Sequence, residues 1–402
     1  MSSASTTSAP IEPIAYERFA ATRFFSNLNG IRAFAILAVL WHHAGGTTFG
    51  ASFPGLPAQV KSFAARGFLG VDVFFVISGF LIVTLLLRER DRRGHIDLKK
   101  FYARRSLRIF PVYYAFIAGV TLLYVVLKPG SEEAGDIVSS LPTTLLYLSN
   151  VWLPAAGILH VTWSLATEEQ FYMLWAPAEK WLRGLGLALL LGAVIALSLV
   201  THAGVFDPWI QSVYSHDGQP YIPSVFGTTL LPIALGVVLA HAMHHPRPFR
   251  WVARATAFPG APAVYTAALL GLTLLWHHDL RGWSRPTLQL LMTGLVAALV
   301  LRDRRAESPL ARLLQWGPLV RIGIVSYGIY LFHLPITGFL IAPLTRLTGS
   351  ADGAAFTALW FTATVALTWG VAELSFRFFE QPILKLKKRY ETTPQHPQNP
   401  PA

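Results

Sequence analysis

Residues 27–43 read NLNGIRAFAILAVLWHH, an apolar stretch that decides the class of fold. Between Arg32 and the two histidines at its end every residue is apolar, and the segment is close to the length that a helix needs to cross a bilayer. Arg32 and His43 are eleven residues apart, close to three helical turns, so both project from one face, roughly 16 Å apart along the axis. An ionisable residue inside lipid costs about 2.5 to 3.5 kcal/mol and is a candidate functional residue. Alternatively, Arg32 reaches the inner interface and His43 lies at the outer one.

The composition of the whole chain agrees with a membrane protein. Its 402 residues are 53% hydrophobic and only 13% charged, with a mean hydropathy of +0.46, about half the charge of a soluble domain. The net charge of +12 would suggest a nucleic-acid partner in a soluble protein, but here it indicates basic cytoplasmic loops and no nucleic acid. The absence of cysteine excludes disulfides, thiolate catalysis and a Cys-ligated metal.

Apolar stretches recur along the chain and predict an all-α, polytopic membrane protein with ten transmembrane helices. The ten segments are 27–44, 68–87, 110–127, 163–178, 185–200, 224–241, 261–276, 287–301, 324–342 and 356–372. Residues 141–153 are too short to span and are expected to be re-entrant or interfacial, although an eleventh span would invert everything after them. With ten spans, most of the 33 Lys and Arg fall on one side, which places both termini in the cytoplasm. Residues 1–22 and the basic, Pro-rich 386–402 are expected to be disordered tails around a membrane domain, 23–385.

The second span begins GFLGVDVFFVISGF and carries Asp72 one turn in. Because the first helix runs outward and the second inward, Asp72 and His43 should lie at similar depth. A carboxylate beside an imidazole fixes its tautomer and raises its basicity. The alternative is an acid that complements the dipole at the start of a helix.

The third span is preceded by KKFYARRSLRIFP, in which Arg104, Arg105 and Arg108 cluster on the cytoplasmic side. Three guanidinium groups suit phosphate oxygens, which accept paired hydrogen bonds. The same charges could instead fix the topology and bind anionic lipids.

Two later spans carry further polar residues. Glu168 and Tyr172 share a face of the fourth span, TWSLATEEQFYMLW, and Glu168 is expected at the depth of His43, unless the glutamates only cap the helix. In the ninth span, SYGIYLFHLP, the polar face carries Ser326, Tyr330 and His333, where the histidine could simply bond a neighbouring helix.

These segments together resemble the membrane acyltransferase-3 family of bacterial inner-membrane O-acyltransferases. The resemblance covers residues 28–382 and rests on six motifs in the family's order: LNGIRAFAILAVLWHH, GVDVFFVISGFLI, RRSLRIFPVYY, TWSLATEEQFYMLWAP, SYGIYLFHLP and FRFFEQP. The family's motif residues fall on Arg32, His43, Asp72, Ser78, Arg104, Arg105, Arg108, Ser164, Glu168, Ser326, Tyr327, Tyr330, His333 and Glu380.

The resemblance implies transfer of an acyl group, expected to be acetyl, from acyl-CoA to a hydroxyl of a glycan, polysaccharide or glycosylated small molecule. It implies that His43 is the general base, held by Asp72 or Glu168 and accompanied by Arg32. Donor binding would fall to Arg104, Arg105, Arg108, Ser78, Tyr172, Ser326, Tyr330 and His333, with no metal and no permanently bound cofactor. The bilayer is the remaining partner, in a multi-pass protein of the bacterial inner membrane.

Depth creates a difficulty for this chemistry, because the base lies toward the outside while the donor is inside. The thioester arm must thread into the bundle, or the acyl group must be relayed. The alternative function is a transporter of acyl groups or of a lipid-linked glycan, in which the same ionisable residues line a pathway. The absence of an internal repeat argues against it.

Overall fold

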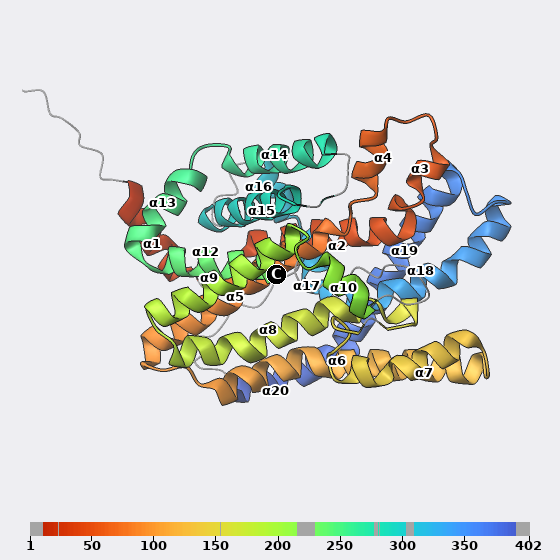
Figure 1. Cartoon of the computed structure of the whole chain (residues 1–402), viewed down its shortest axis with the longest axis horizontal. Coiled ribbons are helices and arrows are strands. Elements are labelled where there is room, and N and C mark those ends of the chain that lie inside the picture. The colour runs from red at the N-terminus through yellow and green to blue at the C-terminus, as the bar shows by residue number, and fades with distance from the viewer. Residues whose placement is uncertain are drawn as a thin grey trace, which may run out of the picture.

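The computed structural model describes residues 11–22, 24–152, 154–214, 230–276, 280, 282–302 and 309–390, and within them all regular structure is helical (Figure 1). The longer helices lie side by side along the long axis of the molecule. The helices are α1 (Ile11–Ala21), α2 (Ser26–Trp41), α3 (Phe49–Ser52), α4 (Ala58–Ala64), α5 (Leu69–Arg93), α6 (Leu98–Leu127), α7 (Glu132–Leu145), α8 (Thr162–Trp181), α9 (Leu185–His202), α10 (Asp207–Tyr214), α12 (Leu230–His244), α13 (Pro246–Thr256), α14 (Ala261–Leu275), α15 (Ser284–Leu301), α16 (Pro309–Leu314), α17 (Gly317–Ile324), α18 (Ser326–Thr348), α19 (Ala354–Ser375) and α20 (Gln381–Leu386). Short π- or 3₁₀-helical turns cover His42–Gly46, Gly157–Leu159, Phe376–Glu380 and Lys387–Tyr390.

Helices occupy the ten predicted segments, apart from residues 224–229, which lie outside the described residues. Within the described chain, six helical segments are long and apolar enough to cross a membrane, and eight if each of two bent pairs is one span. α2 and α14 belong to the bent pairs, α12 has only 15 residues, and α8 carries three glutamates. A multi-pass helical membrane protein is therefore supported, whereas ten spans and cytoplasmic termini stay predictions.

α5 is the central helix, and its crossing with α12 depends on two glycines. A Cβ on Gly79 would lie 2.2 Å from the carbonyl oxygen of Ile233, and one on Gly236 would lie 2.3 Å from that of Val76. Only glycine allows the two backbones to approach this closely. Because successive residues are about 100° apart around a helix, seating Gly79 against α12 leaves the neighbouring Ser78 facing the other side, where the site lies.

Residues 141–152 of the short apolar segment form the end of α7 and the start of an irregular connection to α8, and residue 153 lies outside the described residues. α7 has 14 residues, about 21 Å of helix, which is shorter than a bilayer core. Its last turns are tied to α6 because Tyr113 donates to the carbonyl oxygen of Thr144 over 2.7 Å. The described residues therefore give no eleventh span here.

The expectation of a disordered N-terminal tail is wrong for residues 11–22, which form α1 and its end. Arg88 donates to the carbonyl oxygens of Thr22 (2.6 Å) and Phe19 (2.9 Å), the orphan acceptors at the end of α1. Residues 1–10 lie outside the described residues. At the other end a helical turn, Lys387–Tyr390, follows α20, and residues 391–402 lie outside the description.

Candidate active site

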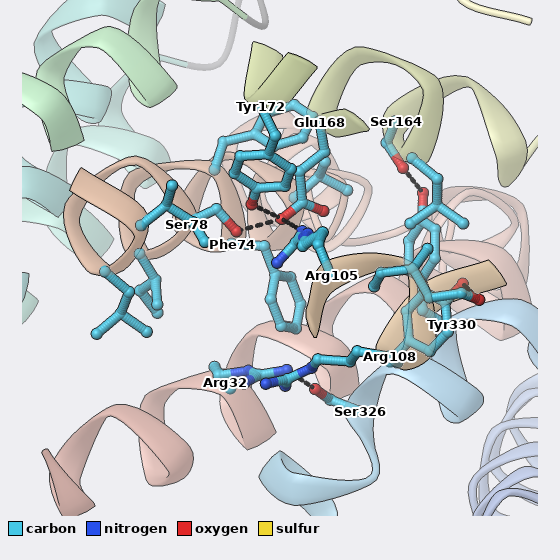
Figure 2. A pocket seen from close by; sticks show the side chains of 18 of the residues that line it. Arg32, Phe74, Ser78, Arg105, Arg108, Ser164, Glu168, Tyr172, Ser326 and Tyr330 are labelled. Atoms are coloured by element: carbon cyan, nitrogen blue, oxygen red, sulfur yellow. Dashed lines mark hydrogen bonds and ion pairs between the residues drawn. The ribbon is translucent and has the colours of Figure 1, made fainter. Parts of the chain in front are cut away.

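A cavity of about 160 Å³ lies among α2, α5, α6, α8 and α18 (Figure 2). Its lining is apolar on one side, mainly from α5, and polar on the other. The polar residues at the cavity are Arg32, Ser78, Arg105, Arg108, Ser164, Glu168, Tyr172, Ser326, Tyr327 and Tyr330. Five motifs that are distant in the sequence therefore meet at one place, as the resemblance implies.

Glu168 is the acceptor at the centre of one wall. Its Oε1 accepts hydrogen bonds from the hydroxyls of Ser78 and Tyr172 and, over 3.1 Å, from Arg105 Nη2. Three donors converge on one carboxylate oxygen, and together they stabilise the charge of Glu168. The expected contact between Glu168 and His43 is not formed.

Arg105 is fixed by partners within the protein. Its Nε donates to Glu169 over 3.1 Å while its Nη2 reaches Glu168, and its guanidinium lies 3.7 Å from the ring centre of Tyr172. Its carboxylate partners leave little of its charge for a ligand. Arg105 therefore organises the wall of the cavity.

Arg32 and Arg108 differ from Arg105 because they keep hydrogen-bonding capacity toward the cavity. Arg32 Nη2 donates to Ser326 Oγ over 2.9 Å, whereas its buried Nε has no partner. Arg108 is exposed into the cavity, and no hydrogen bond or ion pair joins it to the rest of the described chain. The Arg108 side chain extends toward Arg32 in Figure 2. Two guanidinium groups with spare donors make this part of the cavity suitable for an anion.

The three arginines predicted to bind the donor do not all lie at the cavity, because Arg104 is turned away from Arg105 and Arg108. Arg104 Nη2 pairs with the buried Glu89 over 3.1 Å, and its Nη1 donates to the carbonyl oxygen of Tyr390. It therefore ties the α5–α6 connection to the C-terminal turn. The side chains of Arg104 and Arg105 point in different directions because adjacent helical residues are about 100° apart.

Tyr330 connects the cavity to the histidines. Its hydroxyl lies 2.6 Å from Ser164 Oγ, and its ring centre is 5.5 Å from that of His333, one turn further along α18. His333 Nε2 lies 3.3 Å from His43 Nδ1. Ring contact between Tyr330 and His333, followed by the bond between the two histidines, therefore connects the cavity to the end of α2.

The hydrogen bonds of the two histidines determine their tautomers. His333 Nδ1 lies 2.6 Å from the carbonyl oxygen of Tyr330, and His43 Nδ1 lies 3.0 Å from that of Val39. A carbonyl oxygen only accepts, so in the neutral rings both Nδ1 atoms carry the proton. The one Nδ1–H of His43 is then shared between the carbonyl oxygen of Val39 and His333 Nε2, and His43 Nε2 keeps its lone pair. That nitrogen is the one suited to act as a base.

His42 and His43 have different surroundings. His42 Nδ1 lies 2.7 Å from the carbonyl oxygen of Ala65 and its ring packs on Phe68, which anchors the end of α2 to the start of α5. The backbone from His42 to Gly46 is a π-helical turn, a distortion frequent at functional sites. The non-helical residues of this turn are Ala44 and Gly45, so the two adjacent histidines serve separate partners because successive helical residues are about 100° apart.

The expected pairing of Asp72 with His43 is also wrong. Arg285 donates to both oxygens of Asp72 over 2.9 and 3.0 Å, and Gln289 Nε2 donates over 3.0 Å. The carboxylate is completely buried, so this pair is a clamp between α5 and α15. Sequence reasoning missed Arg285 because it lies two residues before the predicted span 287–301. Among the described residues the side chain bonded to His43 is therefore that of His333 rather than an acid.

The fold and the cavity together define a helical membrane protein with a buried site of carboxylate, guanidinium, hydroxyl and imidazole groups. The family model described as "Acyltransferase domain" matches residues 25–373. The chain therefore belongs to this acyltransferase family, as its motifs predicted.

Curated relatives carry names of the same kind. The peptidoglycan O-acetyltransferase OatA of Listeria monocytogenes is 29% identical over 387 residues, which cover 90% of this chain and 56% of the relative. YrhL of Bacillus subtilis, provisionally named a peptidoglycan O-acetyltransferase, is 28% identical over 90% of this chain and 55% of its own length. The chain thus spans little more than half of these relatives. No solved structure gives a significant match.

Proposed function

We propose that the protein is an integral-membrane O-acyltransferase that moves an acetyl group from acetyl-CoA to a hydroxyl of a glycan. The family supports acyl transfer, and the names of the relatives support an O-acetylated glycan as the acceptor class. The single observation that carries the proposal is a histidine with a free Nε2, joined through His333 and Tyr330 to a cavity that presents two guanidinium groups.

In the proposed reaction His43 Nε2 takes the proton of the acceptor hydroxyl as its oxygen attacks the thioester carbonyl. The C–S bond breaks, and the thiolate leaves with the proton that His43 returns. His333 accepts from His43 Nδ1–H throughout and holds the ring in its reactive tautomer, so it is a positioning residue. General base catalysis of this kind contributes about 10² to 10⁴ in rate.

Arg32 and Arg108 are proposed to hold the phosphates of the donor. Arg32 is roughly 16 Å from His43 along α2, so an extended donor arm could reach from the guanidinium groups past Tyr330 to the base. The present cavity of about 160 Å³ resembles one of about 150 Å³ that holds a benzene molecule. The nucleotide therefore stays at the mouth of the cavity, and passage of the arm requires the cavity to widen. The small volume of the cavity also favours an acetyl group over longer acyl chains.

The localisation proposed with this function is the bacterial inner membrane, where acyl-CoA is available on the cytoplasmic side. The expectation that both termini are cytoplasmic agrees with donor entry at the basic end of the bundle. A relay, in which the acyl group passes through an enzyme-bound ester, is the alternative to direct transfer.

The test uses purified full-length protein in detergent with radiolabelled acetyl-CoA and a peptidoglycan-derived glycan. We expect labelled ester on the glycan from wild type, loss of nearly all product in His43→Ala, and largely retained activity in the matched variant His42→Ala. Equal loss in both variants would show that His43 has no special role. A protein that binds donor but forms no acylated product would instead support the transporter function.

A further inference from the structure

α13 is a short amphipathic helix whose two faces differ sharply. Phe249 and Ala253 are buried against the bundle. The opposite face is formed by four residues at spacings i, i+3, i+4 and i+7, which place them in one stripe along the helix. That face consists of Arg247, Arg250, Trp251 and Arg254, all exposed, and Trp251 is 71% exposed. The helix PRPFRWVARAT contains no acidic residue.

Contacts at both ends hold α13 in place. Tyr16 of α1 donates to the carbonyl oxygen of His244 over 2.8 Å and packs edge-on against Phe249. At the other end Arg302 Nη2 donates to the carbonyl oxygens of Ala257 and Phe258. The orientation of the exposed arginine face relative to the helix bundle is therefore fixed by these contacts.

The position of α13 relates this face to the bilayer. α13 is bent by 68° from α14, and the two helices meet at the end of the molecule where α1 lies (Figure 1). α14 exposes large apolar side chains, among them Val264 (55%) and Leu275 (67%), which suit contact with acyl chains. The arginine face of α13 thus lies next to the end of the lipid-facing surface of α14. At that depth a bilayer presents its phospholipid headgroups. Exposed tryptophan is also typical of that level.

We propose that the arginine face of α13 binds the phosphate groups of anionic phospholipids and lies flat on the membrane surface. Guanidinium groups bind phosphate oxygens through paired hydrogen bonds. Trp251 inserts its ring among the headgroups, and its neighbour Arg254 already lies 5.3 Å from the ring centre. An acidic protein is a poorer partner, because α14 holds the same face against the bilayer. The proposal does not depend on acyl transfer.

The test measures binding of phosphatidylglycerol and of phosphatidylcholine to the full-length protein in detergent, for example by native mass spectrometry. The variant Arg247→Gln/Arg250→Gln/Arg254→Gln removes the charge of the face. Its matched control, Lys99→Gln/Arg183→Gln/Arg312→Gln, removes the same charge from exposed residues outside α13.

We expect wild type and control to prefer phosphatidylglycerol and the α13 variant to lose about fivefold in affinity per arginine, roughly a hundredfold in all. Arg250→Gln alone should lose about fivefold, which keeps the test informative if the triple variant unfolds. Unchanged binding by the α13 variants would overturn the proposal. So would equal losses in variant and control, since binding would then follow net charge, or equal affinity of wild type for the two lipids.

Discussion

Replacing Arg105 with alanine should destabilise the protein, whereas the same change at Arg108 should not. Arg105 makes ion pairs of 3.1 Å with both Glu168 and Glu169, and their side chains are mostly buried. Removing the cation leaves two carboxylates side by side without a counter-charge, although Glu168 keeps its hydrogen bonds from Ser78 and Tyr172. Breaking a buried pair in this way costs about 3–5 kcal/mol. Arg108 has no such bond within the described chain, so its loss should change the unfolding free energy by less than about 0.5 kcal/mol.

The assay combines thermal unfolding in detergent with acetyl-CoA binding. Arg105→Ala should unfold at a clearly lower temperature, and Arg105→Lys should be intermediate because it keeps the charge but loses the two-pronged contact. Arg108→Ala should unfold like wild type and bind acetyl-CoA more weakly. A stable Arg105→Ala together with an unstable Arg108→Ala would refute the assignment of the two arginines. Wild-type donor affinity in Arg108→Ala would refute its proposed role in donor binding.

Three further predictions follow from the contacts. His333→Ala should lower kcat more than it changes KM, by less than His43→Ala does, and steady-state kinetics would contradict the positioning role if only KM changed. Asp72→Ala should cost about 3–5 kcal/mol by leaving Arg285 buried and unpaired, and thermal unfolding should show recovery in Asp72→Leu/Arg285→Leu; no recovery would mean that the clamp is not the cause. The backbone amide of Lys100 donates a hydrogen bond to the Asp97 carboxylate and holds the pKa of that carboxyl below its usual range. The stability that Asp97 adds as a helix cap is therefore fully present above the pKa of Asp97 in the unfolded chain, and it is lost as the pH falls through the pKa in the folded protein. Asp97→Ala should therefore cost about 1 kcal/mol at neutral pH while Asp97→Asn does not, and similar unfolding temperatures for the two variants would contradict a capping role.

The sequence alone was sufficient to predict where the long apolar helices lie and that this is a membrane protein of the acyltransferase family. Apolar length is a local property, and so is the 3.6-residue period that places Arg32 and His43 on one face. The six motifs also identified most of the residues at the cavity, from Ser78 to Tyr330. Short polar helices escaped this reasoning, and α1 was mistaken for a tail because its packing partners, such as Arg88, are distant in the chain.

Only the tertiary structure decided which ionisable groups pair. The depth of a residue in the bilayer can be predicted by counting residues along each helix, and this count predicted Asp72 and Glu168 at the depth of His43. The lateral position and rotation of each helix depend instead on packing between distant segments. Asp72 finds Arg285 213 positions away, and Glu168 finds Arg105. A buried carboxylate takes the cation that the packing brings to it, because leaving either charge unpaired in the interior costs several kcal/mol. The proposed base, His43, thereby has a second histidine, His333, as its side-chain partner.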